Sequence, residues 1–271
     1  MTGRGSRLQR VVHGASRLLV ALGLLAAGAP VALSPAGART AEEAVAEGDL
    51  HYAAAKLDDA RRAYSEAVQA EPSNVTALCR LARAESELGE LAKGDEQRRT
   101  WADAVVHARA AVRLAAESAE PHVWLAVALG RQALREGPRA KLALSKEIKS
   151  ETDLALARDP GIGRAWHVLA AWNMKIASLS TLERMVANSV LGGVPKGASY
   201  ANAAQAFEKA ISLEPDYVNH HVEYGRLLKD MGRKDDARRE LEKAVALPAT
   251  SSALDMRYQA DARRLLEKLA R

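Results

Sequence analysis

Three segments of this chain repeat one another without gaps, and this repetition constrains the fold more than any other feature. Each has small or apolar residues spaced by 4 and 3 positions, with a proline 5 positions further on. The first three residues share one face of a helix, and the proline ends that helix. The segments are 60–72, 148–160 and 203–215 (ARRAYSEAVQAEP, IKSETDLALARDP and AAQAFEKAISLEP). The sequence therefore predicts a repeated helical unit.

A second register agrees with the first. A glycine followed by two alanines, at separations of 12 and 7 residues, occurs twice: Gly48, Ala60 and Ala67, then Gly225, Ala237 and Ala244. Small residues on facing helices let two antiparallel helices approach closely, as in the 34-residue tetratricopeptide (TPR) hairpin. Gly232, within DMGRKDDA, is expected at the turn between the last two of these helices.

The predicted fold is all-α: a TPR-like solenoid of about five helical hairpins, a C-terminal capping helix and one helical insertion. Helix-forming residues dominate the chain, and no alternating apolar run predicts a strand. Residues 39–271 form this domain, and an irregular helical bundle is the alternative. The hairpin units are expected at 41–74, 75–120, 121–162, 163–217 and 218–251, and the capping helix at 252–270.

Three units are longer than the 34-residue repeat. The stretches 94–103 (GDEQRRTWAD) and 135–141 (REGPRAK) are interpreted as longer turns. The insertion at 178–200 is expected to hold a short helix that Ser180 or Thr181 caps and that glycines and a proline end. Its apolar residues either cover the concave face of the solenoid or form a patch for a partner, and we expect them to pack against the array. They are Leu182, Met185, Val186, Val190 and Leu191.

Residues 1–38 have the pattern of a secretory signal peptide. Arginines precede an apolar run of 12 residues at 18–29, and Ala36 and Ala38 place small residues before a cleavage point. Such a run is short for a membrane span. We expect cleavage after Ala38 and a periplasmic or secreted protein; the alternative is an uncleaved N-terminal anchor close to a membrane.

Charge and cysteine usage exclude two classes of function. The net charge of +5 includes four arginines of residues 1–38, which have no acidic residue, so the remainder carries +1. A nearly neutral body does not predict a nucleic-acid partner. Cys79 is the only cysteine, which excludes an internal disulfide and a cysteine-based metal site, and we expect it in the core.

The sequence predicts neither catalysis nor a cofactor. Nucleophile elbows, phosphate loops, dinucleotide fingerprints and metalloprotease motifs are missing from it. The stretch NHHVEYG suggests a metal, since His220 and Glu223 share a helix face, but a site needs a third ligand. We expect His221 to be a packed, hydrogen-bonded residue facing the second helix of its hairpin, in the position that Trp124 and Trp166 fill in the two preceding repeats. No metal site is therefore predicted.

The second half of the chain resembles the regulator of microtubule dynamics family, over about residues 140–270. The resemblance lies in LSKEIKSETDLALARDP, AWNMKIASLSTLERMVAN, GGVPKGASYANAAQAFEKAISLEP and LEKAVALPATSSALDMRYQADARRLLEKL, in that order. One departure is Ala170-Ala171-Trp172, where the family's pattern has Gly-Arg before the tryptophan. The resemblance implies a helical adaptor near a membrane, with an apolar ligand groove as a further implication. A microtubule role would not transfer to an exported bacterial chain.

The predicted function is a non-enzymatic adaptor that binds a protein partner, as a peptide or helix, through its concave face in the cell envelope. The alternative is a carrier of a lipid or other apolar ligand in a groove that the insertion covers. The repeat register places seven candidate partner-binding residues near the concave face: Tyr52, Leu125, His167, Lys175, Val222, Arg226 and Lys229. A solvated basic face is the alternative interpretation of the cations among them.

Overall fold

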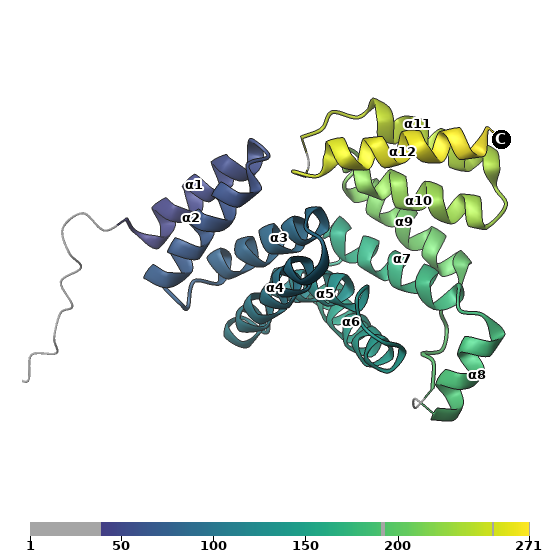
Figure 1. Cartoon of the computed structure of the whole chain (residues 1–271), viewed down its shortest axis with the longest axis horizontal. Coiled ribbons are helices and arrows are strands. Elements are labelled where there is room, and N and C mark those ends of the chain that lie inside the picture. The colour runs from purple at the N-terminus through teal and green to yellow at the C-terminus, as the bar shows by residue number, and fades with distance from the viewer. Residues whose placement is uncertain (1–38, 191–192, 251, 271) are drawn as a thin grey trace, which may run out of the picture. The chain divides into compact units, whose positions relative to one another are not determined.

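The chain is helical throughout the part that the structure describes. The computed structural model describes residues 39–190, 193–250 and 252–270, in which twelve α-helices and no strand occur (Figure 1). The helices are α1 (Ala41–Ala53), α2 (Leu57–Ala70), α3 (Val75–Leu91), α4 (Gly94–Leu114), α5 (Ala119–Ala133), α6 (Pro138–Arg158), α7 (Gly163–Ala177), α8 (Thr181–Val190), α9 (Tyr200–Leu213), α10 (Val218–Asp230), α11 (Lys234–Ala246) and α12 (Asp255–Leu269). The all-α prediction is confirmed.

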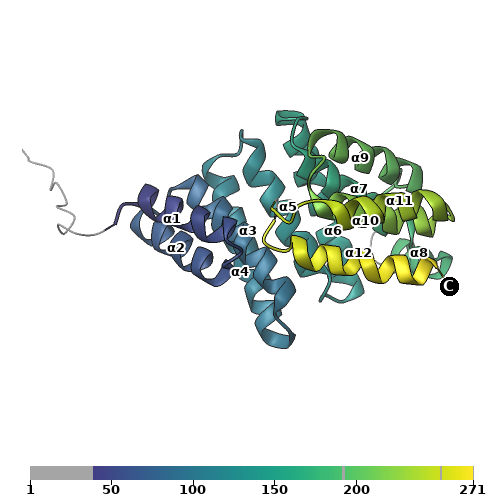
Figure 2. The ribbon, with the colours of Figure 1, turned by 90° about the horizontal axis from the view of Figure 1, so that it is seen from above.

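The helices pack in pairs, and each pair packs on the next. α1 pairs with α2, α3 with α4, α5 with α6, α7 with α9, and α10 with α11, as the two views in Figures 1 and 2 show. Contacts of α2 with α3, α4 with α5, α6 with α7 and α9 with α10 join successive hairpins. The predicted boundaries between units fall at or within two residues of the connections between these hairpins.

Local signals begin and end the helices. Thr40 starts α1: its hydroxyl accepts the N–H of Glu43 at 3.1 Å, and the Glu43 carboxylate accepts the N–H of Thr40 at 2.8 Å. This reciprocal pair is a capping box. Gly232 follows α10 with φ of +79°, and the next N–H, that of Arg233, returns to the carbonyl of Leu228 at 2.9 Å. The positive φ explains the glycine at this turn.

The glycines of the second register lie where two helices approach most closely. A Cβ on Gly48 would lie 2.4 Å from Cε1 of Tyr64, and one on Gly225 would lie 2.7 Å from Cγ of Leu241. The tyrosine and the leucine belong to the second helix of the respective hairpin and are buried. The predicted close approach of the paired helices is confirmed at both positions.

The repeated face is the face that each second helix buries. Its nine small or apolar positions are all under 9% exposed: Ala60, Tyr64, Ala67, Ile148, Thr152, Ala155, Ala203, Phe207 and Ala210. They belong to α2, α6 and α9, the helices that follow α1, α5 and α7 in their hairpins. Cys79 is also in the core, as expected, and burial raises the pKa of its thiol to about 12.

Two of the expected longer turns differ from the structure. The stretch 94–103 is helical and forms the start of α4, so that prediction is wrong. The stretch 135–141 is a turn only up to Gly137, because Pro138 takes the first position of α6. Proline suits that position, where no N–H is needed. The extra residues thus lengthen second helices, and α4 and α6 have 21 residues each.

The insertion forms the short helix α8, with the predicted cap. The Ser180 hydroxyl accepts the Glu183 N–H at 3.2 Å, and the Glu183 carboxylate accepts the Ser180 N–H at 2.8 Å. Arg184 joins α8 to α7 by donating to the carbonyls of Ile176 and Ala177, at the end of α7. The exposed fractions are 64% for Leu182, 57% for Met185 and 47% for Val186. The expectation that these three residues pack within the array is therefore wrong.

The last helix, α12, packs along α10 and α11, as Figure 2 shows. It begins three residues later than predicted, at Asp255, and ends at Leu269. None of the helices in the described ranges is long and apolar enough to cross a membrane. The predicted signal peptide, residues 1–38, lies outside the described residues.

Candidate binding surfaces

The first helices of the hairpins present polar and aromatic side chains that contact one another from repeat to repeat. We call this set the inner face. It consists of Tyr52, Arg83, Glu87, Glu90, Trp124, Arg131, Arg164, His167, Tyr217, His220 and Glu223. All of them lie on α1, α3, α5, α7 and α10, apart from Tyr217, which directly precedes α10.

Two arginines stack against the aromatic rings of this face. The guanidinium of Arg83 lies 3.8 Å from the ring centroid of Tyr52 and 5.5 Å from that of Trp124. That of Arg164 lies 5.9 Å from the Trp124 ring and 4.8 Å from the Tyr217 ring. Cations over aromatic faces within about 6 Å are attracted to the ring. The alternation of cation and ring links neighbouring hairpins through side chains alone.

Two glutamates of α3 lie on the inner face, where their carboxylates form hydrogen bonds or ion pairs with residues of neighbouring repeats. The Glu87 carboxylate is 8% exposed and accepts the Tyr52 hydroxyl at 2.7 and 2.8 Å. Burial raises its pKa, which Arg83 offsets only in part. One turn later, Glu90 pairs with Arg131 of α5. A carboxylate this buried requires such partners, because an unpaired one would be strongly destabilising.

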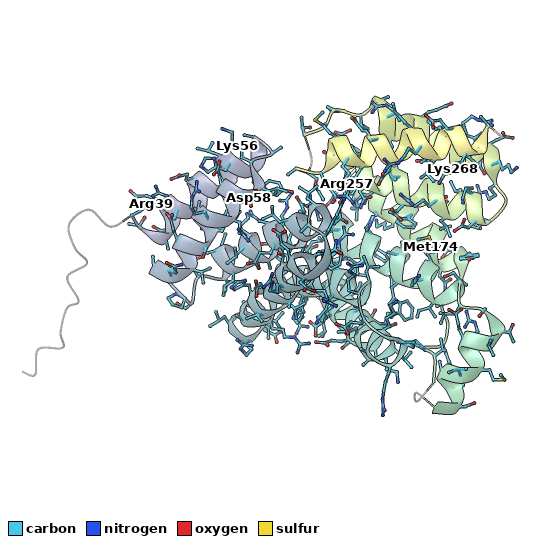
Figure 3. All side chains as sticks on the ribbon, viewed as in Figure 1. Arg39, Lys56, Asp58, Met174, Arg257 and Lys268 are labelled. Atoms are coloured by element: carbon cyan, nitrogen blue, oxygen red, sulfur yellow. The ribbon has the colours of Figure 1, made fainter. Side chains whose placement is uncertain are left out.

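The C-terminal segment 252–258 crosses the inner face. The Ser252 hydroxyl donates to Glu87 at 3.4 Å, and the Ala253 N–H donates to the Tyr52 hydroxyl oxygen at 3.4 Å. Tyr258 donates to the Glu90 carboxylate at 3.2 Å. Arg257, which is labelled in Figure 3, donates to the Glu90 carbonyl. The chain's own C-terminal segment, rather than the insertion, thus covers this part of the inner face.

Two histidines meet further along the inner face. Nδ1 of His167 lies 2.9 Å from Nδ1 of His220, so one ring donates and the other accepts. Nε2 of His220 lies 3.2 Å from the Glu214 carboxylate. Burial lowers the pKa of both rings, that of His167 to well below its usual value. Both are therefore neutral near pH 7.

The neighbouring His221 points away from this pair, as predicted. Its Nδ1 lies 2.7 Å from the carboxylate of Glu240 on α11, and its Nε2 lies 2.8 Å from the Pro215 carbonyl. It is 4% exposed. Glu240 belongs to the second helix of the hairpin, so the expected packed and hydrogen-bonded role is confirmed. Within the described residues, no three His, Cys, Asp or Glu side chains are grouped to hold a metal ion.

The same position in the preceding repeats is filled by Trp166 and by His122. In each, a ring nitrogen lies 2.8 Å from the carbonyl oxygen of the residue six positions earlier, as in His221. His122 also meets a second-helix carboxylate, that of Glu151, at 2.6 Å. The interpretation that Trp124 fills this position is wrong, since its indole N–H turns to Glu120 of its own helix at 3.2 Å.

The seven candidate partner-binding residues separate into three groups. Tyr52 and His167 belong to the inner face and are held there by the contacts described above. Leu125 and Val222 are 3% and 0% exposed and pack in the hydrophobic cores, so neither presents its side chain at the surface in this conformation.

The other three candidates are cations. Arg226 pairs with Glu223 of its own helix at 3.1 Å and with Asp261 of α12 at 3.7 Å. Lys175 and Lys229 are exposed on the first helices α7 and α10. The ammonium of Lys229 lies 3.3 Å from the carboxylate of Asp230 beside it. Both lysines are accessible to a partner, although Lys229 already has an acidic neighbour, whereas Arg226 is less exposed and pairs with two carboxylates.

A cleft of about 530 Å³ opens at the edge of the inner face. The N-terminal ends of α5 and α7 line it, and its lining residues include Trp124 and Arg164 together with the charged residues Glu117, Glu120 and Arg158.

Reasoning from the sequence missed the charged members of the inner face. The spacing of Arg83 and Glu87, four residues apart on one helix face, was the available signal.

Comparisons with known proteins agree with the fold. The family described as "Regulator of microtubule dynamics protein 1-3" matches residues 44–270, a longer stretch than the resemblance over 140–270. "Regulator of microtubule dynamics protein 3" of Rattus norvegicus is 30% identical over 186 residues, which are 68% of this chain and 39% of the rat protein. "Regulator of microtubule dynamics protein 1" of Bos taurus is 25% identical over 228 residues, 83% of this chain and 71% of that protein.

A solved structure supports the TPR prediction. The crystal structure of a thermophilic TPR protein of Thermus thermophilus superposes with a TM-score of 0.58, covering 82% of this chain and 98% of that one. Its sequence identity is 18%, so this likeness concerns the fold alone. It confirms a TPR-like solenoid.

Proposed function

The chain belongs to the regulator of microtubule dynamics family, and on that premise we propose that it is a non-enzymatic scaffold that binds a protein partner through its inner face. Arrays of TPR hairpins present side chains of their first helices along an extended surface, which suits a peptide or a helix. Family membership and the TPR fold support a scaffold rather than a catalyst. The chain spans 39% of the length of the rat relative, so the activity in that relative's name belongs to that whole protein.

One observation carries the proposal: a short non-helical segment of the chain already docks on the inner face. Residues 252–254 place a hydroxyl and a main-chain N–H against Glu87 and Tyr52. Leu254 buries its side chain in the core beside them, at 2% exposed. The inner face therefore recognises main-chain and side-chain groups of a bound segment in the way that a partner peptide requires.

We place this scaffold in the cell envelope because of the predicted signal peptide at 1–38. The mature protein would begin at Arg39, and N-terminal sequencing of protein purified from its native host tests this. An intact N-terminus in a cytoplasmic fraction would contradict it. Under export, the partner is an envelope protein rather than a component of a cytoplasmic cytoskeleton.

A lipid carrier is the alternative function. The apolar side chains that would belong to its ligand groove, Leu182, Met185 and Val186, are exposed on α8, and the segment leading into α12, rather than α8, contributes the cover of the inner face. Native mass spectrometry of the purified chain separates the two functions. A bound small molecule of defined mass favours the carrier, and a bare polypeptide favours the scaffold.

The experiment for the scaffold compares crosslinked partners of three forms of the chain in its native host. The wild type is compared with Lys175→Glu/Lys229→Glu, which reverses two exposed charges on α7 and α10, the first helices that also carry His167 and His220 of the inner face. The matched control, Lys141→Glu/Lys234→Glu, reverses two exposed lysines of second helices. We expect one partner to be recovered with the wild type and the control, and lost with the first variant. Recovery of the wild type without any crosslinked protein contradicts the proposal.

A further inference from the structure

A second groove lies between α6, α7 and α9, away from the inner face. Its volume is about 600 Å³, and none of the residues that line it belongs to the inner face. Its eleven lining residues include three lysines, two tryptophans and three side-chain amides, and none of them is acidic. We call it the α6–α9 groove.

Two tryptophans of α7 form an aromatic floor that is already held in place. The indole N–H of Trp172 donates to the Ser145 carbonyl at 2.9 Å, and that of Trp166 donates to the Pro160 carbonyl at 2.8 Å. Leu169 lies between them on the same helix. Because hydrogen bonds fix both rings, an apolar side chain meets a preformed surface and little ordering is needed to bind it.

Three lysines line the groove beside this floor. The ammonium of Lys149 lies 2.6 Å from the Asp153 carboxylate and 5.5 Å from the centroid of the Trp172 ring. Lys196 and Lys209 are exposed, and in the described part of the chain neither has a carboxylate within ion-pair distance. The described domain carries a net charge close to zero, so this cationic rim is a local feature and not a general excess.

The insertion supplies part of the groove. Residues 178–199 separate α7 from α9, and Lys196 and Gly197 near their end line the groove. The Asn202 amide donates to the Gly197 carbonyl at 2.8 Å and fixes this connection to α9. The Gln205 amide, one turn along α9, is exposed and can meet the main chain of a bound segment.

The dimensions of the groove suit a short extended segment. Its α9 wall runs from Asn202 to Lys209, which corresponds to roughly 10 Å along the helix. An extended peptide covers that distance in about three residues. A single apolar side chain can therefore sit on the tryptophans while the residues on either side reach the lysines.

We propose that the α6–α9 groove binds an acidic peptide segment of a protein partner, with one apolar side chain on the tryptophan floor and carboxylates paired with Lys196 and Lys209. Lysines that lie apart act as single charges, and each can pair with a separate carboxylate. Arginine, whose planar fork binds phosphate in a bidentate manner, is missing from the lining residues. A recessed floor also suits a peptide better than the flat surface of a bilayer.

The test measures binding of a fluorescein-labelled peptide with a central leucine flanked by aspartates, by fluorescence anisotropy with the full chain. A peptide with asparagines in place of the aspartates tests the charge requirement. Lys196→Glu/Lys209→Glu should weaken binding of the acidic peptide by roughly tenfold or more. The control Lys141→Glu/Lys234→Glu changes the net charge equally at exposed sites outside the groove and should leave binding unchanged.

Affinity of the wild type should fall with added salt, since the paired charges are exposed. Lys196→Gln/Lys209→Gln serves as a second variant if the charge reversal unfolds the chain, as circular dichroism would show. Equal binding by the wild type and the groove variants overturns the proposal, and so does equal binding of the asparagine peptide. Binding of anionic phospholipid vesicles, without binding of the acidic peptide, also overturns it and assigns the groove to a lipid.

Discussion

Replacing Gly225 by alanine has two opposing effects on the free energy of unfolding, and their sizes follow from the structure. Alanine within a helix is favoured over glycine by about 1 kcal/mol. The added Cβ, however, would lie 2.7 Å from Cγ and 2.9 Å from Cδ2 of Leu241, with the Ala237 carbonyl 3.4 Å away. Normal carbon contacts are about 3.5–4.0 Å, so α10 and α11 must separate by a large part of an ångström.

Leu241 cannot absorb this displacement easily, because its side chain is 0% exposed. Overpacking of this kind costs about 1–3 kcal/mol. The steric cost offsets the helix preference at least fully, and we expect Gly225→Ala to lower the free energy of unfolding by up to about 2 kcal/mol. Gly130→Ala is the matched control: a Cβ there meets no atom within 4 Å, so only the helix preference acts. That variant should gain up to about 1 kcal/mol.

Urea unfolding followed by circular dichroism measures both variants, with the m-value as a check that the unfolded state is unchanged. Repeat arrays can unfold in segments, so hydrogen exchange of the amides in α10 and α11 is measured as well. In the double variant Gly225→Ala/Leu241→Ala, the new Cβ fills part of the space that the leucine leaves. The destabilisation of the double variant should then be smaller than the sum of the two single-variant destabilisations by at least about 1 kcal/mol. A gain in stability for Gly225→Ala equal to that of Gly130→Ala would refute the close approach.

Three further predictions concern single side chains. Tyr52→Phe removes the hydroxyl whose single proton is shared between the two oxygens of the Glu87 carboxylate, and it should cost about 1–2 kcal/mol in urea unfolding; an unchanged midpoint would show that water replaces the hydroxyl. The pKa values of His167 and His220 are lowered by burial, so their neutral forms stabilise the fold at pH 7 and this contribution is lost as pH falls below about 6.5. Between about pH 6.5 and 5, the free energy of unfolding of His167→Gln should therefore fall less steeply with decreasing pH than that of the wild type. The difference in slope should correspond to about one bound proton, and equal slopes would contradict the buried neutral pair. Met185→Ser should change the melting temperature little, because that side chain is 57% exposed, and a clear drop would mean that α8 packs on the array.

The hairpins are predictable because their signals are local. A glycine and two alanines at separations of 12 and 7 residues indicate which helix faces meet, since only small side chains permit the close approach of the two paired helices. The Ser180 cap of α8 and the turn at Gly232 are equally local. The turn predicted for 94–103 is wrong because the excess over the repeat length need not form a loop. Added helical turns accommodate the same residues and leave the pairing of α3 with α4 intact.

The inner face is less predictable because its contacts join distant parts of the chain. Ser252 and Glu87 are 165 residues apart, and the local spacing of Arg83 and Glu87 indicates a pair on one helix face but no contact with Ser252. The repeat register selects Tyr52 and His167 as partner-binding residues, which stays a prediction, and in the structure both contact residues of neighbouring repeats. It also selects Leu125 and Val222, which the cores bury, because it gives a residue's position along the helix and only approximately its direction.

The charges of the inner face determine which segment can lie there. Desolvating a carboxylate such as Glu87 costs several kcal/mol, and apolar residues in its place would stabilise the array as well or better. What Glu87 and Tyr52 add is specificity, since Glu87 accepts the Ser252 hydroxyl and the Tyr52 hydroxyl oxygen accepts the Ala253 N–H. A partner that docked at this point would have to present the same groups to replace these two hydrogen bonds. Under the proposed function, such a partner and residues 252–258 would compete for this part of the inner face, so binding of the partner and release of the segment would promote each other.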